Sequence, residues 1–283
     1  MADSPAQAVF CDLSDRALIR VAGADARTFL QGQLSNDVRQ VSPELSQLTA
    51  LNTPQGRTLA LMRLFEFDGT LFLLLPEALR VSIVKRLQMY VLRAQVEITQ
   101  CNDLAVAGIA GDAATAVLAT AGIEAPESVD QCIGGDGMAA IRVPGDALPR
   151  YEVVAPPTQL AVLREHCQTA DIDEWRLMDT LVGIPLLGPE TSGEFVAQML
   201  NLDLLGAICF QKGCYTGQEV IARAHYRGRV KRRLRLILRS QPAEPGTTVA
   251  LSENESVTVI QSAQTPRQEY ATLVVGPVNG SAD

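Results

Sequence analysis

The residues best suited to chemistry stand together at 212–219, in the sequence Lys-Gly-Cys-Tyr-Thr-Gly-Gln-Glu. Thr216 and Glu219 have the spacing of a capping box, which predicts a helix that begins at about Gly217. Cys214 then lies just before the helix N-terminus, where free N–H groups favour negative charge, and Lys212 adds a cation. The pattern predicts a functional thiol with a raised thiolate fraction near neutral pH.

A purely structural interpretation of the same residues stays open. Cysteine is often a small, buried and inert packing residue. Gly213 and Gly217 allow positive φ angles, so the stretch could simply form a turn. Local features alone do not decide between a reactive Cys214 and a structural one.

The stretch resembles the signature of the YgfZ family, which comprises folate-binding or tRNA-modifying proteins related to the glycine-cleavage T-protein, an aminomethyltransferase. The similarity continues in chain order through most of the sequence. It covers 23–25, 30–38, 54–57, 192–195, 201–203 and 222–228. The resemblance implies an α+β, T-protein-like fold with three domains in a ring around a central cavity.

Periodicity and turn residues predict how the chain is divided. Alternating strands and helices over 48–124 indicate an α+β, ferredoxin-like unit. Short strands separated by Pro and Gly indicate a small C-terminal β-barrel over 233–283. Segments 1–47 and 125–232 would form a discontinuous first domain that carries the motif. Asp68-Gly69 between two apolar runs predicts a hairpin. Helices are expected at 25–34, 77–91, 158–167 and 171–181.

Composition narrows the class of protein. The chain has 283 residues, 47% hydrophobic and 20% charged, which is typical of a globular protein with two or three domains. A net charge of −8 argues against indiscriminate nucleic-acid binding. Six cysteines without a Cys-x-x-Cys pair indicate free thiols in a reducing compartment. With neither a signal pattern nor a long apolar run, we expect a cytoplasmic protein that does not enter a membrane.

One segment reverses the overall charge. It contains seven cations and no acidic residue: Arg223, Arg227, Arg229, Lys231, Arg232, Arg233 and Arg235. From 233 onward the cations alternate with Leu234, Leu236 and Leu238, which predicts a half-buried strand. Two interpretations stay open for 223–235: a solvated cationic face, or a weak binding site for RNA or another polyanion, such as the polyglutamate tail of a folate.

The resemblance also implies a tetrahydrofolate site. Trp175, the only tryptophan, would stack on the pterin, although a core anchor on its helix is the alternative. Arg16 stands where some relatives carry a second aromatic residue, and it could stack or bind a glutamate tail. Asn36 and Asp37 either form a turn or lie beside the cavity. The remaining implied binding residues are Tyr215, Gln218, Glu219, Arg223, Tyr226 and Arg227.

Two departures from the relatives limit the chemistry. T-proteins carry an acidic pair where this chain has Leu59 and Ala60, which cannot transfer protons. Leu181 replaces a glutamate that is thought to anchor the pterin. Asp179 is close in sequence, but a two-residue offset on a helix predicts that it points elsewhere.

Three functions remain open. The first is a folate-binding protein that supports assembly or repair of iron–sulfur enzymes, including tRNA-thiolating ones, through Cys214. A single cysteine cannot hold a cluster that needs about four ligands, so no stable metal is expected. The second is a tetrahydrofolate-dependent C1 transferase of the T-protein kind. The third is a scaffold without folate that binds through the basic segment.

Overall fold

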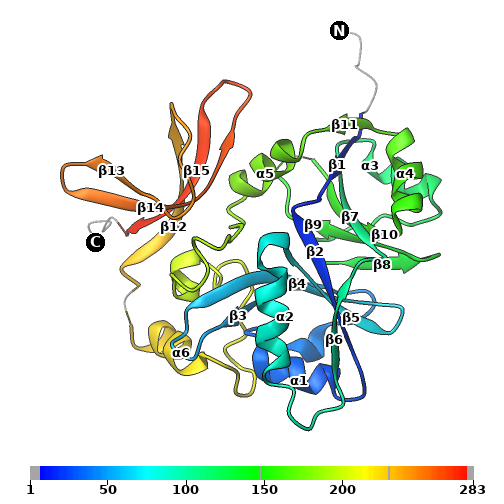
Figure 1. The fold of residues 1–283 in the computed structure, drawn as a ribbon. Coiled ribbons are helices and arrows are strands. Elements are labelled where there is room, and N and C mark those ends of the chain that lie inside the picture. The colour runs from blue at the N-terminus through cyan, green and yellow to red at the C-terminus, as the bar shows by residue number, and fades with distance from the viewer. Residues whose placement is uncertain (1–6, 147, 229, 279–283) are drawn as a thin grey trace.

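The chain forms three β-sheets, which Figure 1 shows together with the helices that pack on them. The computed structural model describes residues 7–146, 148–228 and 230–278. Arg229 of the basic segment lies outside these residues. Among the described residues, no helix combines the length and apolar composition required to span a bilayer.

The first sheet has five antiparallel strands in the order β3-β4-β5-β2-β6. Asp68 and Gly69, with φ angles of 49° and 71°, form the predicted turn between β4 and β5. Helices α1 and α2 bury apolar residues such as Phe29 and Leu87 against one face of this sheet. The elements are β2 (Arg16–Ala22), α1 (Ala26–Gln33), a 3-10 turn (Val38–Gln40), β3 (Gln47–Asn52), β4 (Thr58–Phe67), β5 (Thr70–Pro76), a 3-10 turn (Glu77–Leu79), α2 (Arg80–Gln88) and β6 (Glu97–Cys101).

The second sheet has six strands in the order β11-β1-β7-β10-β9-β8. Only the short β11–β1 pair is parallel. One face packs against the five-stranded sheet through a core that contains Phe65, Phe72, Ile141 and Trp175. Helices α3 and α4 cover the other face. The elements are β1 (Val9–Asp12), β7 (Ala105–Ala110), α3 (Ala114–Thr120), β8 (Cys132–Gly135), β9 (Met138–Val143), β10 (Arg150–Ala155), α4 (Pro157–Glu165), β11 (Gln168–Ala170) and α5 (Ile172–Leu181).

The strand pairing differs from the expected division of the chain. Segment 48–124 does not form one unit, because β3 to β6 belong to the five-stranded sheet and β7 belongs to the six-stranded sheet. The N-terminal segment is divided in the same way, with β1 in one sheet and β2 in the other. Alternation along the chain identifies strands, but it does not report which strands pair.

The C-terminal sheet has four antiparallel strands in the order β12-β15-β14-β13. In the described chain β12 and β13 are edge strands that do not pair with each other, so the sheet is open and the predicted barrel is not closed. Leu234 is buried as expected, but Leu236 and Leu238 are 41% and 61% exposed because the core does not extend along this edge. The strands are β12 (Arg232–Arg239), β13 (Thr248–Ser252), β14 (Glu255–Gln264) and β15 (Tyr270–Pro277).

Candidate functional site

The 212–219 motif forms the loop that leads into α6 (Gln218–Tyr226). The helix begins within one residue of the predicted position, and it ends before Gly228. The predicted capping box is wrong. The N-cap is Gly217, with φ of 86° and no side-chain cap, so Thr216 stands one position too early to cap the helix.

Lys212 fastens this loop to the end of α1. Its Nζ donates to the carbonyl oxygens of Gln31, Leu34 and Asn36 at 2.8, 2.6 and 2.8 Å. An ammonium group has three N–H donors, so these bonds use all of them. A cation is also favourable where the unpaired carbonyls of a helix C-terminus gather.

Burial determines the electrostatics of Lys212. The residue is 6% exposed, and burial lowers the pKa of its ammonium group to about 8, while the nearby Asp37 carboxylate opposes this shift. With every donor bonded to α1 or the segment just after it, Lys212 has none left for Cys214. These bonds indicate a structural role for Lys212, whereas the sequence suggested that, with Cys214, it forms a catalytic pair in which its charge supports the thiolate.

Asn36 and Asp37 lie in the same segment after α1 to which Lys212 binds. The Asn36 amide donates to the carbonyls of Leu48 and Gly206, both at 2.8 Å, and its Oδ1 accepts the Asp37 backbone N–H. The Asp37 carboxylate accepts from Arg39, and these bonds lower the pKa of the carboxyl group to about 2. Both residues lie in the turn after α1, where Asp37 caps the 3-10 turn Val38–Gln40, and neither lines the small cavity between the two larger sheets.

Two glycines lock the start of α6 onto the β3–β4 turn. A Cβ on Gly217 would lie 2.5 Å from the Thr53 carbonyl oxygen and 3.1 Å from Gly56 Cα. A Cβ on Gly56 would lie 2.9 Å from Val220 Cβ. Both glycines have positive φ angles. This contact brings segment 54–57 against the motif, although the two are far apart in sequence.

The Cys214 side chain is exposed in the 212–219 loop. Lys212 and Tyr215 are each 6% exposed, whereas Cys214 is exposed, and the other five cysteines are buried or half-buried. Burial raises the pKa of Tyr215, whose ring packs in the core of the first sheet. The Gln218 amide lies 3.5 Å from the Lys212 carbonyl oxygen. The loop therefore presents one thiol to solvent from a fixed backbone.

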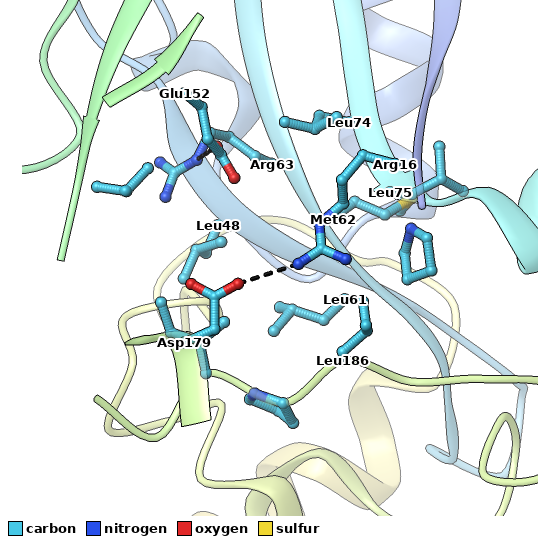
Figure 2. A pocket seen from close by; sticks show the side chains of 14 residues that line it. Arg16, Leu48, Leu61, Met62, Arg63, Leu74, Leu75, Glu152, Asp179 and Leu186 are labelled. Atoms are coloured by element: carbon cyan, nitrogen blue, oxygen red, sulfur yellow. Dashed lines mark hydrogen bonds and ion pairs between the residues drawn. The ribbon is translucent and has the colours of Figure 1, made fainter. Parts of the chain in front are cut away.

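A small cavity, called the central cavity below, lies elsewhere, between the two larger sheets, α5 and the loop at 184–186 (Figure 2). Its volume is only about 60 Å³. Arg16 and Asp179 meet across it with a 3.0 Å ion pair, and Asp179 also binds Arg150 at 2.6 Å. Apolar side chains such as Leu61 fill much of the remaining wall. No residue of 212–219 lines this cavity.

Asp179 is the charged residue that the sequence argument missed. Asp179 and Leu181 do point in different directions, as predicted, but Asp179 faces the cavity and Leu181 is 47% exposed. The missed signal was the presence of Arg16 and Arg150, because an acidic residue can be buried on a helix only when cations pair with it.

Trp175 takes the core position that was the alternative to pterin stacking. It is 0% exposed, and the Arg150 guanidinium lies 4.2 Å from its ring centroid. The backbone of Gly108 covers the indole so closely that a Cβ there would lie 2.4 Å from Trp175 Cε3. In this conformation the indole has no free face for a pterin.

The remaining predicted binding residues separate into two groups. Glu219, Arg223, Tyr226 and Arg227 are exposed along α6 and do not line the central cavity. The arginines of β12 instead bind other groups of the protein. Arg233 binds Asp203 through two 2.9 Å bonds, Arg235 pairs with Glu255, and Arg232 donates to the Val275 carbonyl.

No family model matches the chain. A curated relative does: the tRNA-modifying protein YgfZ of Klebsiella pneumoniae (strain 342) is 32% identical over 225 residues, 78% of this chain and 69% of the relative. The chain belongs to the YgfZ family. The aminomethyltransferase T of the Bartonella henselae glycine cleavage system matches 96% of this chain and 79% of its own, with a TM-score of 0.80 at 18% identity. The α+β, T-protein-like fold is therefore confirmed.

Ala60 is fully buried and Leu59 half-buried, so the positions of the acidic pair hold only apolar side chains. Within 7–146, 148–228 and 230–278, no group of three or more His, Cys, Asp or Glu residues could hold a metal ion.

Lys212→Met tests the structural role of the lysine. The variant leaves three carbonyl oxygens without their donor, so we expect the free energy of unfolding to fall by about 2–4 kcal/mol. Urea denaturation measures this loss. Lys85→Met is the matched control, since Lys85 is exposed in the last turn of α2 and should change stability by less than about 0.5 kcal/mol. Equal stability of Lys212→Met and wild type would contradict the assigned role.

Proposed function

We propose that this protein supports iron–sulfur enzymes that act in tRNA modification, and that the Cys214 thiol is the group through which it acts. The observation that carries the proposal is the contrast within the motif: Lys212 and Tyr215 are buried while Cys214 between them is exposed. Membership of the YgfZ family, with a relative described as tRNA-modifying, supports the biological setting.

The exposed position suits contact with a macromolecule. A thiol on a fixed surface loop can reach a cluster or a thiol held by a partner enzyme, whereas a thiol inside a narrow cavity cannot. One cysteine supplies one of about four ligands that a cluster needs, so the partner would supply the others. The cluster is then cargo of the partner enzyme.

Folate is left out of this mechanism because the cavity does not fit it. Ligand pockets generally measure about 300–1,000 Å³, whereas the central cavity measures about 60 Å³. The Arg16–Asp179 ion pair spans it, and Trp175 offers no free face. Aminomethyl transfer is not proposed either, since the positions of the acidic pair hold Leu59 and Ala60.

Calorimetric titration of tetrahydrofolate tests this exclusion. Because the cavity is small and the Arg16–Asp179 ion pair spans it, we expect no saturable heat, which corresponds to a Kd weaker than about 0.1 mM. A one-to-one isotherm with a low-micromolar Kd would contradict the expectation and show that the cavity opens in solution. Loss of that isotherm in Asp179→Asn would then locate the ligand between Arg16 and Asp179.

Complementation with Cys214→Ser tests the proposed function. In cells that lack this protein, wild type should restore the activity of an iron–sulfur tRNA-thiolating enzyme, whereas Cys214→Ser should restore almost none. The readouts are enzyme activity and the level of thiolated tRNA at equal protein abundance. Cys167→Ser is the control, since that half-exposed thiol lies outside the motif loop. Full restoration by Cys214→Ser would refute the role of the thiol.

A further inference from the structure

The C-terminal end of α6 carries a cluster of aromatic side chains beside the thiol loop. The Phe210 and His225 rings stack with centroids 3.8 Å apart and an interplanar angle of 14°. Tyr226 meets both edge-on, at 6.2 Å from Phe210 and 4.7 Å from His225. Phe210 comes four residues before Cys214 in the sequence, and His225 and Tyr226 lie in the last turn of the helix that the thiol loop leads into.

This cluster does not serve the hydrophobic core. Phe210 anchors it, because that ring is half-buried against the core of the first sheet. His225 is exposed, and Tyr226 is 65% exposed. Exposed aromatic side chains that pack on a half-buried ring are typical of surfaces that stack on a ligand.

Cations flank the aromatic cluster. Arg223 and Arg227 are exposed on either side of His225 and Tyr226, and neither makes an ion pair with any residue that the structure describes. The cations of β12 differ, since Arg233 and Arg235 are neutralised by Asp203 and Glu255. Of the described cations in this basic segment, Arg223 and Arg227 at α6 and Lys231 after it are exposed and form no ion pair with another described residue.

We propose that the C-terminal end of α6 binds unpaired nucleotides of an RNA. Bases would stack on Tyr226 and His225, and phosphates would contact Arg223 and Arg227. Stacking needs only the π-face of a base, and adjacent arginines attract the backbone, so this combination is that of surfaces that bind single strands. The proposal deepens the proposed function and rests on it for its biological setting, because it gives the protein that carries the proposed thiol a contact with RNA of its own.

The negative net charge of the protein limits how much electrostatic attraction can contribute to RNA binding. With a net charge of −8 and Glu219 one helical turn before Arg223, long-range attraction is weak. Affinity must then come from stacking and from a few local phosphate contacts. Binding should be stronger for single strands than for duplexes, whose bases are stacked on one another, and it should weaken as salt rises.

Fluorescence anisotropy with a labelled single-stranded RNA oligonucleotide tests the proposal on the full chain. Tyr226→Ala should weaken binding at least about fivefold, whereas Tyr226→Phe should bind like wild type because the ring remains. The double variant Arg223→Ala and Arg227→Ala should reduce the slope of log affinity against log salt by about 1.4. Circular dichroism confirms that each variant is folded.

The matched control is a second cation–aromatic pair on another surface. Arg86 lies 5.6 Å from the centroid of the Tyr90 ring on the α2 side of the molecule, and Tyr90 is 37% exposed. Replacing both by Ala should leave RNA binding unchanged. Cys214→Ser should also bind RNA normally, so that failure of the thiol proposal and failure of the RNA proposal are separate results.

Several outcomes would overturn the RNA proposal. They are absence of binding by wild type, equal affinity for duplex RNA, unchanged binding by the α6 variants, and an equal loss in the Arg86/Tyr90 control. If Tyr226→Ala abolishes complementation in cells while wild type binds no RNA, the surface docks a protein instead, and the proposal is wrong.

Discussion

The arrangement of the candidate site depends on one contact, between the Lys212 ammonium group and three carbonyl oxygens at the end of α1. This contact satisfies polar groups that would otherwise be buried without partners. It also fixes segment 201–217, whose Gly217 packs on the β3–β4 turn and whose Tyr215 enters the core. Cys214, which lies between these buried residues, is left in solvent.

The cavity and the thiol are two separate features of the same fold. The ion pair that spans the cavity must stay formed because its charges are buried, with Asp179 between Arg16 and Arg150. Opening it would require these pairs to separate. The thiol lies outside this network, on a loop whose buried residues are held by α1 and the first sheet. A function that uses the thiol therefore does not require the cavity to open.

Sequence reasoning predicted the features that depend on local pattern. The Asp68-Gly69 hairpin, the start of α6 to within one residue and the family were all predicted correctly. It failed where the answer depends on partners distant in sequence. The acceptors of Lys212 lie about 180 residues earlier in the chain, and strand pairing assigns β7 to a different sheet from β6. Asp179 faces the cavity because of two arginines that no local pattern connects with it.

Alkylation of the six cysteines, followed by mass spectrometry in wild type and Lys212→Met, tests the central claim most directly. In wild type, the account predicts that Cys214 reacts first, while the buried Cys11, Cys101 and Cys132 react only on unfolding. In Lys212→Met, the half-buried Cys209 should become nearly as reactive as Cys214, because the loop loses its attachment to α1. A protected Cys214 in wild type, or an unchanged Cys209 in the variant, would contradict the account.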